Sequence, residues 1–243
     1  MSVEFAPLLI EPAYRRVAAA IGARILSREL REGERLPPEL QLARQFGVNR
    51  STLREALREL ESRGLLRRRP GSKLMSVSRP RQQAVAQGVS HALLLHDVTV
   101  RDVWEALTIL EPPLAQAAAR ARSTEDLREL EAAAAAYADS QADADLAVQR
   151  TAEVFRTIGR AAHNPVLALA QEPLLQLLEP SLRVMIDKVP QARSRIATAH
   201  RHLRAALAAR NTDDAHAWMA RHIRDFRRGY EIAGIDLGLR LGV

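Results

Sequence analysis

The segment from residue 39 to residue 77 constrains the fold most, because it combines two short amphipathic helices, a glycine turn and a hairpin pattern. The first helix is expected directly after Pro37-Pro38, where proline and an acid suit a helix start, and Gly47 ends it. Asn49 is a good helix-capping residue, and it predicts a second helix that Gly64 ends. This spacing leaves only a tight turn between the two helices.

A further helix and a hairpin complete this first region. Apolar residues recur at helical spacing over residues 12–29, which predicts an amphipathic helix. Two short strands, 65–69 and 73–77, flank Pro70-Gly71-Ser72, a sequence suited to a hairpin tip. Three helices followed by a β-hairpin predict a winged helix-turn-helix domain over residues 1–78.

The charge of the chain is concentrated in this region. The net charge is +7, and residues 1–80 hold 16 Arg or Lys against 9 Asp or Glu, so the whole excess lies there. The remaining residues are neutral in sum. A basic domain attached to a neutral one indicates that the first region meets a polyanion, most simply nucleic acid.

The helix that begins near Asn49 has the residues needed to read DNA. Arg50 and Arg54 lie four residues apart and therefore on one side, and arginine is the best bidentate reader of guanine. Ser51 and Thr52 lie at the helix N-terminus, where hydroxyl and backbone donors suit phosphate. The alternative is that these residues form the hydrated face of an ordinary helix. The charge asymmetry and the basic hairpin that follows favour DNA.

The second region is expected to be entirely helical. Residues 79–83 are polar and interrupted by proline, which predicts a linker. Residues 84–243 are rich in alanine and show only helical patterns, so the chain as a whole is expected to be mainly α, with an all-α bundle behind the basic domain. The expected helices are 84–96, 99–121, 124–139, 144–163, 165–188, 192–210 and 213–233.

Several classes of protein are excluded by what the sequence lacks. It has no cysteine, and therefore no disulfide framework or thiolate site. The least charged stretch, residues 161–182, contains three prolines and two glutamates and is unsuited to a membrane span. We find no glycine-rich phosphate loop and no nucleophile motif, so an enzyme is not expected. A cytoplasmic protein without membrane contact is the simplest expectation.

The first region resembles the GntR family of bacterial transcription regulators. The resemblance rests on Glu32-Gly-Glu-Arg-Leu-Pro-Pro-Glu39, on Gly47-Val-Asn-Arg-Ser-Thr-Leu-Arg-Glu-Ala-Leu-Arg-Glu-Leu60 and on Gly64-Leu-Leu66. It implies a homodimer on a palindromic operator in double-stranded DNA. One departure is Leu40, where the family usually has a basic residue. The DNA-contacting residues that the resemblance implies are Arg35, Asn49, Arg50, Ser51, Thr52, Arg54, Gly71, Ser72 and Lys73.

The second region resembles the FadR-like (FCD) branch of that family, whose helical domain binds small organic acids. The residues that carry this resemblance are Trp104-Glu105, Leu110-Glu111-Pro112, Phe155, Asn164-Pro165, His200 and His222. Many members hold a divalent metal through an aspartate, a histidine four residues later and two further histidines. His200 and His222 match the two later ligands. Both fall in line with apolar residues of their helices and are expected to point into the bundle.

The first half of the metal motif is missing. Ala152 replaces the aspartate, and Arg156 replaces the first histidine. Two neutral imidazoles without a carboxylate make a poor site for a divalent ion, and a guanidinium beside them would repel it. A bound metal is therefore disfavoured, and the alternative for His200 and His222 is that they are core histidines hydrogen-bonded to neighbouring residues.

We expect Arg156 to take over the electrostatic role of the metal and to bind an anionic ligand directly. The alternative is that Arg156 lies at the helix edge and pairs with a surface acid. The usual pocket arginine is replaced by Leu107. The candidate ligand-binding residues are Leu107, Glu111, Arg156, His200 and His222.

Two functions remain open. The first is a DNA-binding transcription regulator, a repressor in most of the family, whose helical domain senses a small anionic metabolite. The second is an effector-independent dimeric repressor or architectural DNA binder with a degenerate pocket.

Overall fold

The computed structural model describes residues 11–69, 71–72, 74–140 and 142–242. The chain divides into two compact units, of which the first ends at Arg81 and the second begins at Gln82. Within the described residues, no helix has both the length and the apolar character needed to cross a membrane.

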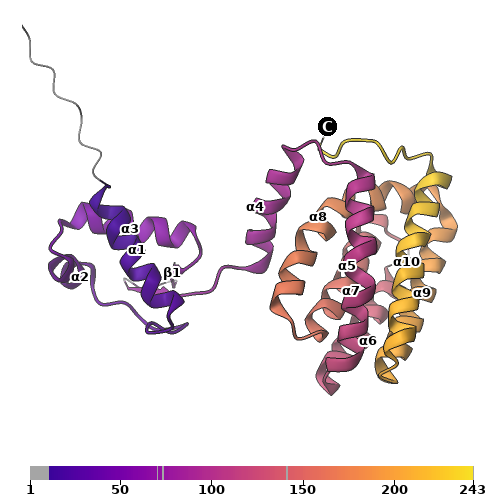
Figure 1. The fold of residues 1–243 in the computed structure, drawn as a ribbon, viewed down its shortest axis with the longest axis horizontal. Coiled ribbons are helices and arrows are strands. Elements are labelled where there is room, and N and C mark those ends of the chain that lie inside the picture. Colours follow the sequence, from indigo (N-terminus) through magenta and orange to yellow (C-terminus); the bar gives the residue numbers. More distant parts are fainter. Residues whose placement is uncertain (1–10, 70, 73, 141, 243) are drawn as a thin grey trace, which may run out of the picture. The chain divides into compact units, whose positions relative to one another are not determined.

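The described part of the first unit contains three helices and a two-stranded sheet. An antiparallel hairpin pairs Leu66 with Val77. Thirteen buried apolar residues form a separate core here, with Leu53 and Ala56 fully enclosed. The elements are α1 (Ala13–Leu26), α2 (Glu39–Phe46), α3 (Arg50–Ser62), β1 (Leu66–Arg68) and β2 (Met75–Val77) (Figure 1).

A segment before α2 extends the hairpin, which the sequence pattern did not indicate. The Gly33 amide donates to the Val77 carbonyl at 2.9 Å, and the Leu36 amide donates to the Met75 carbonyl at 2.9 Å. These bonds tie the entry of the helix-turn-helix to β2. The hairpin is therefore fixed to the body of the unit on one edge.

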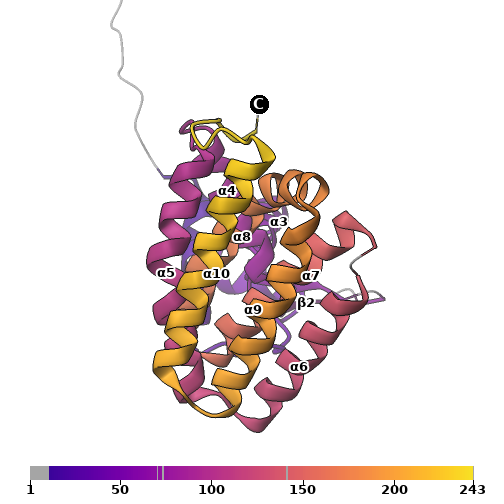
Figure 2. The same cartoon turned by 90° about the vertical axis from the view of Figure 1, so that its right-hand side faces the viewer.

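The second unit is a bundle of helices around one large core (Figures 1 and 2). α5 packs extensively on α10, and α9 lies between α10 and α6. After α10, the Leu241 amide donates to the Val98 carbonyl at 2.9 Å, so the C-terminal segment closes over the start of α5. The helices are α4 (Gln82–Leu94), α5 (Val100–Ala121), α6 (Thr124–Asp139), α7 (Ala144–Ala161), α8 (Pro165–Lys188), α9 (Pro190–Ala208) and α10 (Thr212–Ala233).

The fold class expected from the sequence is confirmed: the chain is mainly helical, with a winged helix-turn-helix followed by a helical bundle. Several expected ends differ by one to three residues, as for α1 (expected over 12–29) and α9 (expected over 192–210), and one difference changes the linker. The expected linker 79–83 is shorter, because α4 already begins at Gln82. The Gln82 side-chain amide donates to the Ala168 carbonyl of α8 at 2.6 Å, which anchors this first turn to the bundle.

Candidate functional site

The N-terminus of α3 is organised by the side chain of Asn49, as its capping character predicts. The Asn49 side-chain oxygen accepts the Thr52 backbone amide at 2.7 Å and the Ser51 hydroxyl at 2.7 Å. Gly47 has φ 64°, a left-handed conformation that glycine adopts without strain, and it turns the chain between α2 and α3. The first turn of α3 is therefore held by side-chain hydrogen bonds in the unbound protein.

The exposed face of α3 carries the charge, and its opposite face is apolar. Leu53, Leu57 and Leu60 are buried in the core of the first unit. Arg50 is exposed and forms no ion pair with any described residue. Because the buried leucines fix the helix, Arg50 is held at the surface with its guanidinium open to a ligand.

Arg54 is positioned by an acid from the preceding helix. Its Nε donates to Glu39 Oε2 at 2.8 Å, and Arg68 of β1 lies 3.5 Å from the other carboxylate oxygen. The hydrogen bond from Arg54 holds the pKa of Glu39 below its ordinary value. Glu39 thus joins α2, α3 and the hairpin through one carboxylate. If Arg54 contacts a phosphate or a base, it must do so while its Nε remains bonded to Glu39.

The hairpin tip is only partly described. Gly71 is exposed with φ 76°, and the Ser72 hydroxyl accepts the Leu74 backbone amide at 3.1 Å. Lys73, a predicted wing contact, lies outside the described residues. Arg35 pairs through its backbone with Ser76 of β2, which places its exposed side chain beside the hairpin.

In the helical unit, His200 of α9 and His222 of α10 are brought together inside the bundle. Their ring centroids are 5.5 Å apart, and both residues are at most 2% exposed. Tyr137 contacts the ring of His200 and Phe155 stacks on that of His222, with centroid distances of 4.8 and 5.4 Å. The inward orientation predicted from the helical pattern is what the structure shows.

The two imidazoles are electrically neutral and poorly satisfied. Burial lowers the pKa of His222 to about 3, and burial together with the neighbouring His222 lowers the pKa of His200. Both ring nitrogens of His200, and Nε2 of His222, are buried without a hydrogen-bond partner among the described residues. A buried polar atom without a hydrogen-bond partner lowers the stability of the folded protein, so this cluster is a local source of instability.

The residues around this pair do not fit a divalent metal. Ala152 presents only a buried methyl group, and the described residues contain no cluster of three or more His, Cys, Asp or Glu side chains suited to a metal ion. Glu153, which could have supplied a carboxylate by turning inward, instead accepts from Arg160 at 3.0 Å on the outer side. Two imidazoles alone give too few ligands for a tetrahedral or octahedral ion.

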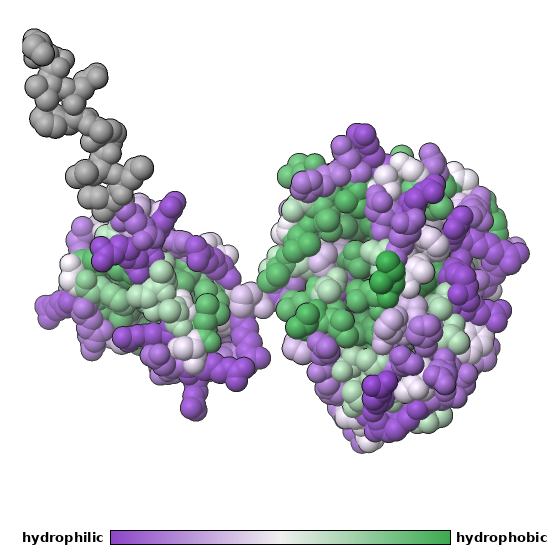
Figure 3. All heavy atoms as spheres, viewed as in Figure 1, coloured by the Kyte–Doolittle hydropathy of each residue, from purple (hydrophilic) through white to green (hydrophobic). Residues whose placement is uncertain are grey.

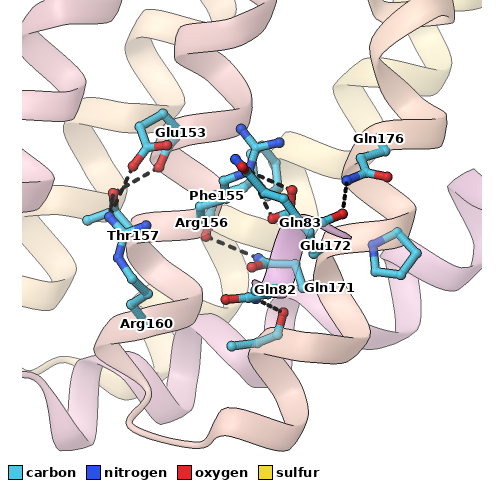
Figure 4. Close-up of polar contacts among 12 residues, drawn as sticks. Gln82, Gln83, Glu153, Phe155, Arg156, Thr157, Arg160, Gln171, Glu172 and Gln176 are labelled. Atoms are coloured by element: carbon cyan, nitrogen blue, oxygen red, sulfur yellow. Dashed lines mark hydrogen bonds and ion pairs between the residues drawn. The ribbon is translucent and has the colours of Figure 1, made fainter. Parts of the chain in front are cut away.

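Arg156 is neither free nor paired with a simple surface acid (Figure 4). Its Nε donates to both carboxylate oxygens of Glu172 at 3.0 and 2.9 Å, and its terminal nitrogen lies 3.3 Å from Glu179. The Glu172 side chain is only 3% exposed. An anionic ligand at Arg156 would therefore compete with a buried carboxylate.

Glu111 lies on α5, one helical turn after the fully buried Leu107. The Gln171 side-chain amide donates to its two oxygens at 3.0 and 3.1 Å and to the Phe155 carbonyl at 3.1 Å. Burial raises the pKa of Glu111 to about 8, although the Gln171 hydrogen bond opposes the rise. Glu111 therefore carries a proton at neutral pH.

Sequence reasoning missed three partner residues: Glu39, Gln171 and Glu172. Glu172 had a readable signal, since it is one of two acids in the least charged stretch of the chain, where an ionised group requires a partner. Glu39 was interpreted as an acid at a helix start, and nothing in the local pattern indicated its two cross-element arginine contacts.

This geometry defines a class of protein. The first unit is a winged helix-turn-helix with an exposed arginine on α3, the second helix of the motif, and it is joined to a helical unit with a buried polar cluster. Such a protein is a DNA-binding transcription regulator. The family description "Bacterial regulatory proteins, gntR family" matches residues 13–74, and the FCD domain matches residues 102–225. The chain belongs to the GntR family, in the branch that carries an FCD domain.

Relatives along most of the chain agree with this assignment. The transcriptional regulator LutR of Bacillus subtilis is 27% identical over 83% of this chain and 95% of its own length. A putative L-lactate dehydrogenase operon regulatory protein of Escherichia coli is 30% identical over 85% of this chain and 82% of its own. Among solved structures, a Streptococcus agalactiae GntR protein aligns with a TM-score of 0.66 at 25% identity, over 88% of this chain and 99% of its own. The relatives are transcription regulators, not enzymes.

Proposed function

We propose that this protein is a repressor that binds a palindromic operator as a homodimer and is controlled by a small anionic metabolite in its helical unit. The observation that carries the proposal is α3, whose capped N-terminus presents Arg50 unpaired while leucines on its other face fix the helix. A helix with this division of faces suits insertion into the major groove.

Specific contacts are assigned by residue type. Arg50 and Arg54 would read base edges, and Asn49, Ser51 and Thr52 would hold phosphate at the positive end of α3. The hairpin with Gly71, Ser72 and Lys73, and the neighbouring Arg35, would lie along the backbone. These contacts are expected to make binding strongly dependent on salt.

The homodimer requires a surface at which two copies meet. Apolar residues gather on the face of the helical unit that carries α4 and α8 (Figure 3). Val85, Val89, Val166 and Leu169 are each at least 44% exposed there. We propose this face as the contact with a second copy, because α4 also receives the chain from the DNA-binding unit. Sedimentation of Val89→Glu against the unaltered protein tests it: the variant should be monomeric.

The effector would bind near the unsatisfied histidine pair. Three buried nitrogens there have no hydrogen-bond partner, and a carboxylate or hydroxyl of a ligand would supply one, with Leu107, Glu111 and Arg156 as further candidate contacts. One relative is a putative regulator of an L-lactate dehydrogenase operon, so L-lactate is the first probe. No metal is assigned a role here, and calorimetry with zinc should show no micromolar site.

A chain of hydrogen bonds links the neighbourhood of this cluster to α4 of the same unit. Gln171 of α8 donates to the carbonyl of Phe155, whose ring stacks on His222, and five residues further along α8 Gln176 donates to the Gln83 carbonyl of α4 at 3.4 Å (Figure 4). Ser90 of α4 donates to Gln176 at 3.0 Å. Occupation of the cluster would shift α8 and with it α4, which begins directly after the first unit. Coupling of this kind is reciprocal, so operator DNA would weaken the effector equally.

The test is selection of bound fragments from the source genome with the full-length protein, followed by footprinting. A palindromic footprint from which L-lactate or a related anion releases the protein supports the proposal; a continuous footprint without sequence preference contradicts it. A repressor of this kind would act in the cytoplasm.

A second candidate is an effector-independent repressor with a degenerate pocket. The specific observation in its favour is that Glu172 and Glu179 already neutralise Arg156. A thermal-shift screen separates the two, since a ligand that binds only the folded protein must raise the melting temperature by mass action.

A further inference from the structure

A groove of about 260 Å³ lies on the outside of the helical unit between α9 and α10, which run side by side (Figure 2). It is separate from the residues assigned to the effector above. The side chains that decide its chemistry are Ser194, Arg195, Thr198, Arg221, Asp225 and Arg228.

The groove carries uncompensated positive charge. It has three guanidinium groups and one carboxylate, and none of Arg195, Arg221 and Arg228 forms an ion pair with any residue that the structure describes. By contrast, Arg227 on the same α10 pairs with Glu231 at 3.1 Å. Like charges gathered in one place repel, and a bound anion would remove that repulsion.

The groove is also partly preorganised. The Arg221 guanidinium lies 4.9 Å from the centroid of the Trp218 ring, a cation–π contact that restricts its rotamers. Trp218 in turn stacks on His202 of α9, with centroids 3.7 Å apart and planes at 5°. Arg195 is half-buried. A preorganised cation loses less conformational freedom when it binds an anion.

We propose that this groove binds a phosphate monoester that carries hydroxyl groups. Guanidinium groups match phosphate oxygens in bidentate geometry, and the net charge of the lining groups balances the charge of about −1.5 to −2 of a monoester at neutral pH. The Thr198 hydroxyl is a further donor. Asp225 accepts from a ligand hydroxyl and repels a second anionic group, which favours a polyol phosphate over a dicarboxylate.

The groove adjoins the buried histidine pair. Arg195 and Asp225 also line a small cavity that reaches His222. A ligand that draws Arg195 outward therefore changes the packing directly above His222. This site goes beyond the proposed function, because its occupation does not require that the histidine cluster binds an effector or that the first unit binds an operator.

The experiment follows the two tryptophan indole N–H signals of the full-length protein by NMR, without DNA, during titration with glucose 6-phosphate. Trp104→Phe assigns the signals. The Trp218 signal should shift and saturate with glucose 6-phosphate, shift less with inorganic phosphate, and stay unchanged with glucose. Arg228→Gln should weaken binding about tenfold, the size expected for losing a charge-assisted hydrogen bond.

The matched control is Arg150→Gln, which removes the same charge from α7, where Arg150 is exposed and has no ion-pair partner among the described residues. It should leave the affinity unchanged. An unmoved Trp218 signal, equal weakening by both variants, or succinate binding as tightly as glucose 6-phosphate would each overturn the proposal. Because the titration contains no DNA and reports only on the outer groove, a negative result would refute this site without bearing on the proposed operator binding or on the effector at the histidine pair.

Discussion

The free energy of unfolding of this protein should decrease above pH 6.5, and replacing Glu111 by glutamine should abolish that decrease. Glu111 is fully buried with Gln171 as its hydrogen-bond donor, and its pKa rises from 4.5 to about 8 on folding. Between these values the folded state keeps a proton that the unfolded state has lost. The free energy of unfolding therefore falls by about 1.4 kcal/mol for each pH unit in this window.

The buried histidines act in the opposite direction at lower pH. Their pKa values fall on folding, for His222 from 6.5 to about 3, so below pH 6.5 only the unfolded state takes up protons. Stability then decreases toward acid by about 1.4 kcal/mol per pH unit for each histidine, which outweighs Glu111. Stability should peak near pH 6.5 and fall by about 1 kcal/mol from there to pH 8, because Glu111 is only half ionised at pH 8 and the histidines still release protons in the unfolded state just above pH 6.5.

Urea unfolding followed by tryptophan fluorescence measures this, because Trp104 and Trp218, the only tryptophans, both lie in the helical unit. The free energy of unfolding of Glu111→Gln should not fall between pH 6.5 and 8, because only the histidine contribution remains and it rises slightly with pH. The control Glu105→Gln changes an exposed acid on the same helix and should decline like the unaltered protein. A level profile in the unaltered protein, or the same decline in Glu111→Gln, would refute the reasoning.

Three further changes have defined outcomes. Gly159→Ala would place a methyl group against the Gln171 side chain and should cost about 1–3 kcal/mol in urea unfolding; no loss would mean that Gln171 moves freely. His200→Leu removes two buried unpaired nitrogens and should raise stability by about 1–3 kcal/mol at pH 7, while lower stability would show that the imidazole has partners. Glu39→Gln weakens the clamp on Arg54 and removes a negative charge beside α3, so affinity for random DNA should rise and discrimination should fall; unchanged discrimination would assign Glu39 to packing alone.

The first unit was largely predictable because its signals are local. Asn49 as a cap and Gly47 as a turn each act within a few residues, and the structure confirms both. The pairing of residues 33–36 with β2 was not predictable, since it depends on backbone bonds between segments about 40 residues apart in the sequence.

The helical unit shows the limit of pattern reading. Periodicity predicted that His200 and His222 point inward, because their own helices fix their direction. The ion-pair partner of Arg156 depends on which residue of α8 faces α7, and a single sequence does not show how the two helices are aligned. The ion pair with Glu172 therefore emerged only from the packed structure.

The central claim is that α3 reads base sequence through Arg50. Its most direct test is the affinity of full-length Arg50→Ala for the selected operator and for random duplex DNA at one salt concentration. The account predicts a loss of about 1–3 kcal/mol on the operator and a much smaller loss on random DNA. Equal losses on both would show that Arg50 contacts only phosphate, and would contradict the account.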